Sequence, residues 1–205
     1  MRPAIFLDRD GVINENRADH VLRWEDFAPV RGALSGLRQL AGLGLPIFVV
    51  TNQAAVARGD ITGAGLDLLH ARMSRLVAAH GGRIDGVYYC PHTAHDNCDC
   101  RKPLPGLFHQ AARAHGLSLG DSYYVGDALT DIAAGQAAKC RTTLVQTGRG
   151  MVQLLQQQAR SYSGYDVARD LTHAARVIKA EEARRAGRPR TLMGLRPRLS
   201  YAQFG

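Results

Sequence analysis

Three aspartates directly follow apolar segments of the chain that read as strands. Asp8 and Asp10 come after the apolar run 4–7, and Asp127 comes after the run 122–125. Carboxylates that lie close together repel one another unless a cation joins them, and hard oxygen ligands favour Mg²⁺. One carboxylate can attack a phosphorus atom while a second, two residues on, donates and accepts the proton. The spacing therefore points to metal-assisted chemistry at a phosphoryl group.

Two further polar residues fit the same chemistry. Thr51 follows the apolar run 46–50 and offers a hydroxyl, and Lys102 supplies a cation that could face an anion held by the metal. Donors and cations around one point suit the charge that develops during phosphoryl transfer. Taken singly, the aspartates have simpler explanations, because Asp-x-Asp-Gly is often only a turn and an aspartate after glycine is often only a helix N-cap. The sequence has no Walker loop, which disfavours nucleotide-driven transfer.

Three of the four cysteines stand together in one segment with a histidine. The set is Cys90, His92, Cys98 and Cys100. Three thiols and one imidazole match a structural, tetrahedral zinc site, although this spacing is tighter than the usual one. Buried free cysteines are the alternative, a redox pair would more typically read Cys-x-x-Cys, and His95 is a rival ligand. Cys140 stands apart and is expected to be an ordinary thiol.

The elements that must position these residues alternate along the chain. Apolar runs predict strands at 4–7, 46–50, 87–89, 122–125, 142–145 and 166–167. Helical spacing predicts helices at 31–43, 63–79, 104–115, 129–138, 151–158 and 170–185. This alternation indicates an α/β fold with a parallel sheet and helices on both faces. Ligands bind beyond the carboxyl ends of such strands, where the polar residues above are placed.

The chain is long enough for one domain, and its positive charge is concentrated at one end. Of the net charge of +8, six charges come from arginines in residues 184–205, a segment without acidic residues, so residues 1–183 carry +2. We therefore predict a domain over 1–183 and a basic, disordered tail over 184–205. A tail of this kind could contact a phosphate-rich partner such as nucleic acid. No other segment indicates a nucleic-acid groove.

The apolar runs are far shorter than the roughly 20 residues of a membrane span. The N-terminal residues show no signal-peptide pattern. We therefore expect a cytoplasmic protein without a membrane partner, in a compartment where thiols stay reduced, which argues against a disulfide in the cysteine segment.

Four segments resemble the motifs of a known family. They are "FLDRDGVINE", "VVTNQAAVARG", "CRKPLPG" and "YVGDALTDIAAG". In this order, and over residues 3–180, they resemble the haloacid dehalogenase superfamily of phosphatases. The resemblance implies a Rossmann-like sheet with the first motif on a central strand, a Mg²⁺ cofactor and an aspartyl-phosphate intermediate.

The resemblance also implies a role for each motif residue. Asp8 would be the nucleophile and Asp10 the general acid and base. Thr51 would bind the transferring phosphoryl group, and Lys102 would balance its charge. Asp8, the main-chain carbonyl of Asp10 and Asp127 would hold Mg²⁺. Asp131 would support this site, although an exposed acid in the first helical turn is the alternative reading.

The cysteine segment narrows the resemblance to a branch with a zinc loop, for which the family pattern favours His92 over His95. This branch includes sugar-bisphosphate phosphatases of the heptose type and histidinol-phosphate phosphatases, and "TNQ-x-x-x-ARG" and "CRKP-x-PG" are closer to the former. By this likeness the substrate contacts would be Asn16, Arg17, Ala18, Asp19, Thr51, Asn52, Gln53, Ala54, Arg101 and Lys102. Ala54 and Ala55 depart from the Ser-Gly usual in the heptose enzymes, which leaves the substrate open.

Segment lengths indicate a fold without a cap domain, because such a domain would need roughly 50 residues of its own between two motifs. We expect a monomeric phosphoric monoester hydrolase that acts on a small phosphorylated sugar. Histidinol phosphate or another small ester is the alternative substrate. A zinc-containing binding protein without catalysis is the alternative of another class.

Overall fold

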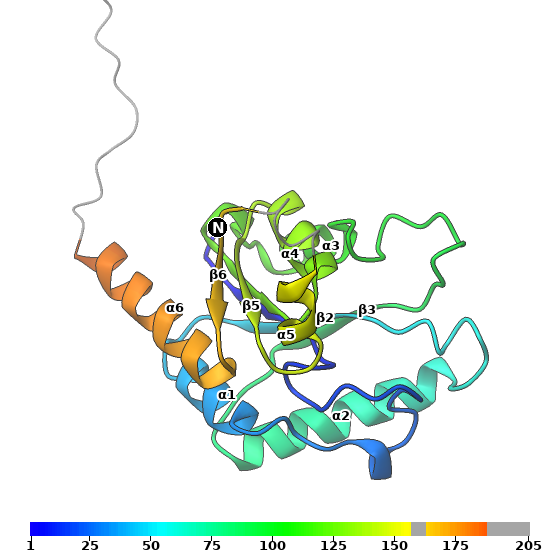
Figure 1. Cartoon of the computed structure of the whole chain (residues 1–205). Helices are drawn as coiled ribbons and strands as arrows, with labels where there is room; N and C mark the ends of the chain where they lie inside the picture. Colours follow the sequence, from blue (N-terminus) through cyan, green and yellow to red (C-terminus); the bar gives the residue numbers. More distant parts are fainter. Residues whose placement is uncertain (157–162, 188–205) are drawn as a thin grey trace, which may run out of the picture.

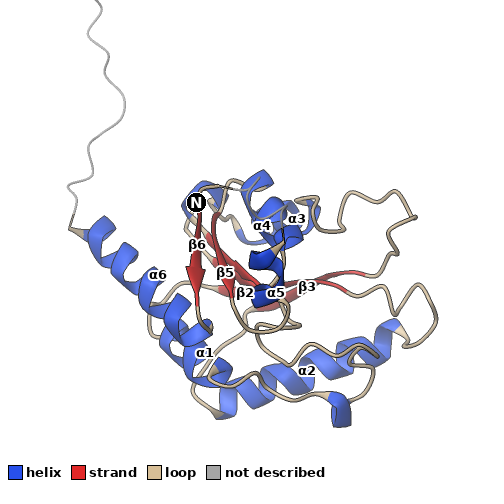
Figure 2. Cartoon of the chain, viewed as in Figure 1, coloured by secondary structure: helices blue, strands red, loops and turns tan. Residues whose placement is uncertain are grey.

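Six parallel strands form one sheet in the computed structural model, which describes residues 1–156 and 163–187 (Figures 1 and 2). The strand order is β3-β2-β1-β4-β5-β6. The strands are β1 (Ile5–Leu7), β2 (Ile47–Asn52), β3 (Gly86–Cys90), β4 (Tyr123–Gly126), β5 (Arg141–Val145) and β6 (Tyr165–Ala168). Strand β1 lies between β2 and β4, so the residues that follow it emerge at the middle of the sheet edge.

Helices cover both faces of the sheet, as the sequence predicts. The helices are α1 (Ala33–Ala41), α2 (Gly63–Ala79), α3 (Gly106–His115), α4 (Leu129–Ala137), α5 (Gly150–Leu155) and α6 (Leu171–Ala186). Two 3₁₀ turns, η1 (Trp24–Asp26) and η2 (Leu119–Asp121), complete the described elements. The predicted α/β class, with β1 inside the sheet, is confirmed.

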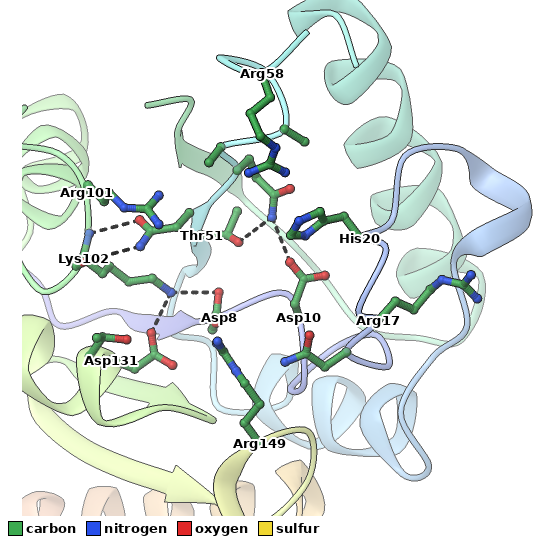
Figure 3. Close-up of a pocket in the computed structure, with 16 residues that line it drawn as sticks. Asp8, Asp10, Arg17, His20, Thr51, Arg58, Arg101, Lys102, Asp131 and Arg149 are labelled. Carbon is green, nitrogen blue, oxygen red and sulfur yellow. Dashed lines mark hydrogen bonds and ion pairs between the residues drawn. The ribbon is translucent and has the colours of Figure 1, made fainter. Parts of the chain in front are cut away.

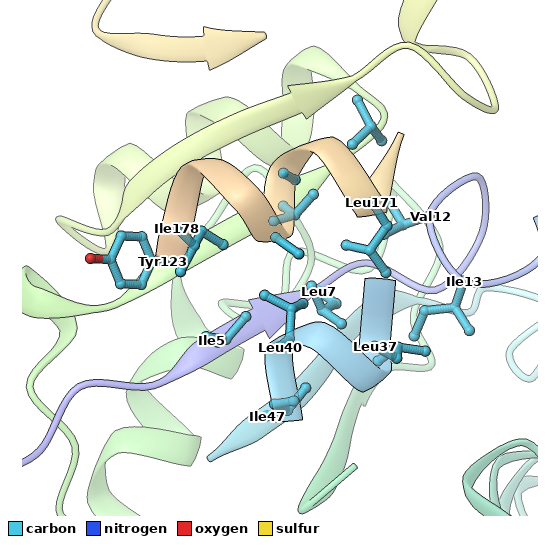
Figure 4. Packing of buried hydrophobic residues seen from close by; sticks show 14 of the residues in the cluster. Ile5, Leu7, Val12, Ile13, Leu37, Leu40, Ile47, Tyr123, Leu171 and Ile178 are labelled. Carbon is cyan, nitrogen blue, oxygen red and sulfur yellow. The ribbon is translucent and has the colours of Figure 1, made fainter. Parts of the chain in front are cut away.

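Successive side chains of a strand point to opposite faces, so each strand contributes to two cores. On one face, Ile5 and Leu7 pack with Leu37 of α1 and with Leu171 and Ile178 of α6 (Figure 4). Helix α2 joins this face through Met73 and Val77.

The opposite face has a separate aromatic core. The ring centroid of Phe6 lies 5.1 Å from that of Phe108 in α3, which is itself 4.8 Å from Tyr124. Ala134 of α4 completes this side. The two cores fix β1 from both faces, and so fix the position of the residues after it.

The observed elements differ from the predicted ones mainly at their ends. Strand β2 continues to Asn52, two residues past the predicted end, because Thr51 and Asn52 pair with Tyr89 and Cys90 of β3. Helix α5 ends at Leu155, and part of the prediction to 158 lies outside the described residues. Helix α6 includes residues 184–186, and residues 188–205 of the predicted tail lie outside the description.

The intervals between motifs contain no cap domain. Between β1 and β2 the chain forms a flap (residues 8–23), η1 and α1, and between β2 and α3 it forms α2, β3 and the cysteine loop (residues 91–105). Over the described part of the chain, every helix is too short or too polar to cross a bilayer.

Candidate active site

A cavity of about 400 Å³ opens at the carboxyl edge of the sheet (Figure 3). Its lining comes from the segments after β1, β2, β4 and β5 and from the end of the cysteine loop. The lining residues are Asp8, Asp10, Asn16, Arg17, His20, Thr51, Asn52, Gln53, Ala54, Ala55, Arg58, Arg101, Lys102, Thr130, Asp131 and Arg149. Most of the residues proposed from sequence for the site therefore meet in one place.

The floor of the cavity is a buried ion cluster around Lys102. Its Nζ lies 2.9 Å from Asp8 Oδ1 and 2.7 Å from Asp131 Oδ1 (Figure 3). It also donates to the Val50 carbonyl at 3.1 Å and to the Tyr124 hydroxyl at 3.0 Å. The Asp8 carboxylate is further fixed by the N–H of Arg9, which donates to Oδ1 at 2.7 Å. This cluster holds Asp8 in one orientation.

Burial and charge act against each other in this cluster. Burial raises the pKa of Asp8 to about 7, although the Lys102 ammonium opposes the shift. Burial alone would lower the pKa of Lys102, but Asp131 and Asp8 together raise it. Lys102 is therefore a permanent cation beside a carboxylate that is costly to ionise in the metal-free protein, and a further cation at Asp8 would favour its ionised form.

Asp131 is buried and supports the cluster, so the exposed alternative does not describe it. Its Oδ2 accepts the N–H groups of Asp127 and Ala128 at 3.1 and 3.0 Å, and its Oδ1 accepts the Tyr124 hydroxyl at 2.9 Å. Helix α4 begins at this point, so one side chain caps the helix and also holds Lys102.

Asp10 is held by neighbours on both of its carboxylate oxygens. Arg9 Nη2 donates to both oxygens at 2.9 Å, Asn14 Nδ2 donates to Oδ1 at 2.8 Å, and Gln53 Nε2 donates to Oδ2 at 2.9 Å. Burial alone would raise the pKa of Asp10, but the Arg9 guanidinium and these hydrogen bonds lower it. Asp10 and Asp8 therefore have opposite pKa shifts, as expected for two carboxyl groups with different tasks.

Arg9 is only 1% exposed, and its second neighbour is His70 of α2, at 3.2 Å between Nη1 and Nε2. Burial and the Arg9 charge lower the pKa of His70 to about 3, so the imidazole is neutral at physiological pH. Neither residue was predicted from sequence. Burial of an arginine cannot be predicted from its place between two aspartates.

The carboxylate set suits a small hard cation. Oxygen atoms of Asp8, Asp127 and Asp131 lie within 4.8 Å of one another, and all three residues are buried. Asp131 is already committed to Lys102 and to backbone N–H groups, which leaves Asp8 and Asp127 as ligands. The main-chain carbonyl of Asp10 accepts no hydrogen bond from the described residues and is free to join them. These oxygen donors fit Mg²⁺.

The end of β2 and the two residues after it line the cavity, and two of their side chains also position other site residues. Asn52 donates to the Lys102 carbonyl at 3.1 Å and accepts the Lys102 N–H at 3.0 Å, so its amide positions Lys102. Gln53 donates to Thr51 Oγ1 at 2.9 Å as well as to Asp10. Ala54 lines the cavity without a polar group.

The flap after β1 contributes only part of its predicted residues. Asn16 and Arg17 line the cavity, and Asn16 Nδ2 lies 3.3 Å from Asp127 Oδ2. Ala18 and Asp19 lie outside the lining, and Asp19 forms an exposed ion pair with Arg17 at 2.6 Å.

Five lining residues were not proposed as site residues from sequence. They are His20, Ala55, Arg58, Thr130 and Arg149. Arg58 and Thr130 lie within two of the family motifs, "VVTNQAAVARG" and "YVGDALTDIAAG". Their closeness in sequence to the proposed site residues was therefore a signal that could have identified them. Arg149 follows β5, and no site residue was predicted after that strand.

The cysteine segment forms a compact cluster of three thiols and one imidazole. Cys90 Sγ lies 3.7 Å from Cys98 Sγ and 3.6 Å from His92 Nδ1, and His92 Nδ1 lies 3.3 Å from Cys100 Sγ. A tetrahedral zinc with sulfur ligands at about 2.3 Å needs ligand atoms about 3.5–3.8 Å apart. The donor set therefore fits zinc, with His92 rather than His95 in the cluster. All four cysteines are free thiols.

The cysteine cluster is connected to the cavity through Arg101. Its Nη1 donates to the main-chain carbonyl of His92 at 2.9 Å, and its side chain lines the cavity. Lys102 is the next residue. The conformation of the cysteine loop therefore affects the positions of two cations of the site, Arg101 and Lys102.

A buried carboxylate paired with a lysine, and a second carboxylate two residues on, lie together at the carboxyl edge of a parallel sheet, as in an α/β phosphohydrolase. The HAD-hydrolase-like family matches residues 99–174. The D-glycero-beta-D-manno-heptose-1,7-bisphosphate 7-phosphatase of Pseudomonas aeruginosa is 39% identical over 150 residues, which cover 73% of this chain and 84% of that protein. The Bordetella bronchiseptica protein of the same name is 38% identical over 177 residues, 86% of this chain and 98% of the relative.

A solved structure agrees with these sequence matches. The B. bronchiseptica D,D-heptose 1,7-bisphosphate phosphatase, crystallised with magnesium and phosphate, matches with a TM-score of 0.81 and 36% identity. The match covers 88% of this chain and 99% of that one. The chain belongs to the HAD-like hydrolases, in the family of these heptose bisphosphate phosphatases.

Proposed function

We propose that the protein is a Mg²⁺-dependent phosphatase that removes the 7-phosphate of D-glycero-D-manno-heptose 1,7-bisphosphate through an aspartyl-phosphate. The observation that carries the proposal is the ion cluster of Asp8, Lys102 and Asp131, with Asp127 within metal-binding distance of Asp8. The family of the relatives supports the substrate.

Asp8 is the nucleophile in this proposal. Its carboxylate attacks phosphorus, the bond from phosphorus to the leaving oxygen breaks, and Asp10 gives that oxygen a proton. Lys102 stays beside Asp8 and balances the negative charge of the phosphoryl group. Bound Mg²⁺, held by Asp8, Asp127 and the Asp10 carbonyl, would supply Lewis-acid stabilisation of the phosphoryl oxygens.

Asp10 acts a second time in the hydrolysis step. It is then a carboxylate, and it takes a proton from the water that attacks the aspartyl-phosphate, which releases phosphate and regenerates Asp8. The hydrogen bonds from Gln53 to both Asp10 and Thr51 place the acid and base next to the hydroxyl that contacts the phosphoryl group. In this proposal Thr51 binds the phosphoryl group and Arg101 binds the substrate.

The cysteine cluster is proposed to hold a structural Zn²⁺. Its four ligands leave no open position for catalysis, and a metal there would fix the loop that presents Arg101 and Lys102. Asn16, Arg17, Gln53, Ala54 and Arg101 are the proposed substrate contacts among the cavity-lining residues. Ala54 offers no hydrogen-bonding side chain, so the sugar hydroxyls must be bound by other groups.

The test is phosphate release with Mg²⁺ over a panel of substrates. The panel contains both anomers of heptose 1,7-bisphosphate, fructose 1,6-bisphosphate, histidinol phosphate and a 3′-phosphorylated oligonucleotide. The proposal expects the highest kcat/KM with a heptose bisphosphate, and the preferred anomer follows from the same data. Preference for histidinol phosphate would keep the mechanism and overturn the substrate. No release from any compound would favour a binding protein without catalysis.

A further inference from the structure

The loop between β5 and α5 packs directly on the proposed metal site through residues 147–149. Thr147 Oγ1 donates to the main-chain carbonyl of Gly11 at 2.6 Å. Gly148 has a φ of +56°, and a Cβ at this position would overlap the Asp127 carboxylate and the backbone of Gly11. Only glycine allows this approach without strain. The sequence "TGRG" therefore brings its arginine to the edge of the carboxylate cluster.

Arg149 contacts Asp127 through two separate groups. Its backbone N–H donates to Oδ2 at 2.8 Å, and its guanidinium Nη2 lies 3.4 Å from Oδ1. The Arg149 side chain is 56% exposed and lines the cavity, whereas Asp127 is fully buried. Figure 3 shows the Arg149 side chain extending from the loop toward Asp8. The backbone contact fixes the loop, and the side chain remains able to move.

The charges around the carboxylate cluster determine which partners the Arg149 guanidinium can have. Lys102 pairs with Asp8 and Asp131, and it leaves Asp127 to Arg149. A divalent cation bound to Asp127 would therefore compete with the guanidinium for the same carboxylate and be repelled by its charge. A phosphoryl dianion near the metal would attract the same guanidinium.

We propose that Arg149 is an exchangeable counter-cation of the metal site. It pairs with Asp127 in the metal-free protein and transfers to the phosphoryl anion when Mg²⁺ occupies Asp127. The inference rests on the proposed Mg²⁺-dependent phosphatase function, and it adds a phosphate-binding residue from a strand that otherwise contributes none. It predicts opposite effects on two ligands. Loss of the guanidinium strengthens metal binding and weakens anion binding, whereas a residue needed only for folding would weaken both.

The experiment measures both affinities by titration calorimetry in wild type and in Arg149→Gln. The first titration uses Mg²⁺ alone, and the second uses inorganic phosphate at saturating Mg²⁺. We expect Mg²⁺ to bind about fivefold tighter and phosphate about fivefold weaker in the variant, the change for roughly one partly exposed ion pair. Arg149→Lys keeps the charge and should restore phosphate affinity to near the wild-type value.

Arg58→Gln is the matched control for the metal titration. It removes one positive charge from the same cavity, but Arg58 pairs with Asp60 at 2.8 Å rather than with Asp127. Its Mg²⁺ affinity should therefore stay near that of wild type. If Arg149→Gln binds both Mg²⁺ and phosphate more weakly, or if neither affinity changes, the inference is overturned while the proposed function stays intact. Wild-type protein that does not bind Mg²⁺ at all would overturn both.

Discussion

The Arg9 guanidinium contacts both carboxylate oxygens of Asp10, at 2.9 Å each, while Arg9 itself is 1% exposed. The proposed acid and base is thus paired with a buried cation that lowers its pKa and keeps it ionised in the free protein. The negative charge of a bound phosphoryl group acts in the opposite direction and raises that pKa. In the proposed mechanism, Asp10 would therefore be a base in the free protein and would act as an acid only when substrate is bound.

Replacement of Arg9 should be costly because it leaves the partly buried Asp10 carboxylate without its cation. We expect Arg9→Met to lower the free energy of unfolding by about 3 kcal/mol, as measured by urea unfolding. The double variant Arg9→Met/Asp10→Asn should recover part of this loss, because it removes the unpaired charge. If the losses of unfolding free energy in the two single variants simply add in the double variant, the Arg9–Asp10 pair is not the cause of the destabilisation.

Removal of the Asp8 carboxylate should abolish turnover without unfolding the protein. Asp8→Asn keeps the shape of the side chain and its hydrogen bond from the Arg9 N–H, but an amide is no nucleophile. We expect kcat to fall by about a thousandfold or more. Circular dichroism serves as the control for folding, and turnover close to wild type would reject Asp8 as nucleophile.

The same variant should also change how stability depends on pH in the metal-free protein. The pKa of Asp8 is raised from 3.8 to about 7, so the folded protein binds this proton more tightly than the unfolded chain does. The Asp8 contribution to stability is therefore present below the unfolded pKa and is lost as pH rises toward 7. In urea unfolding with a chelator, Asp8→Asn should gain stability relative to wild type between pH 5 and 8. A stability difference that does not vary with pH would contradict the raised pKa.

Loss of one thiol from the cysteine cluster should release its metal. Cys98→Ser should lower both zinc content, measured by atomic absorption, and the Tm, because the ligand set becomes incomplete. Cys140→Ser is the matched control: Cys140 is also a free thiol but lies outside the cluster, so zinc content should stay at the wild-type level. Equal zinc in Cys98→Ser and wild type would rule out zinc ligation by this cluster.

Gly148 should tolerate no side chain, because a Cβ would enter the space of Asp127. We expect Gly148→Ala to destabilise the protein by about 1–3 kcal/mol more than Gly44→Ala and to weaken Mg²⁺ binding. Gly44 also has a positive φ, of +74°, but an added Cβ there meets nothing within 4 Å, so it isolates backbone strain. Similar losses in the two variants would mean that the contact with Asp127 adds nothing.

The sequence predicted what depends on local pattern. Apolar runs and helical spacing located the elements, and the positions of Asp8, Thr51 and Asp127 after three different predicted strands placed them at one edge of the sheet. The cysteine cluster could likewise be predicted, because its four ligands lie within eleven residues of chain.

Contacts between distant segments could not be predicted in this way. His70 faces Arg9 because of how α2 packs on the sheet, and Tyr124 reaches Lys102 because alternate residues of β4 point to opposite faces. Arg149 meets Asp127 only because Gly148 permits a close approach. Asn52 lines the cavity, and the two hydrogen bonds of its amide with the Lys102 backbone could not be predicted from sequence. Such assignments need three-dimensional packing.

The lack of a cap domain between β1 and β2 and between β2 and α3 has a consequence for the outcome of the reaction. An acyl phosphate is reactive enough to pass its phosphoryl group to any acceptor hydroxyl. With no domain to close over the cavity, bulk water at about 55 M reaches the intermediate and outcompetes dilute alcohols. The open architecture thus favours hydrolysis over phosphotransfer, and it lets product leave without a conformational opening step.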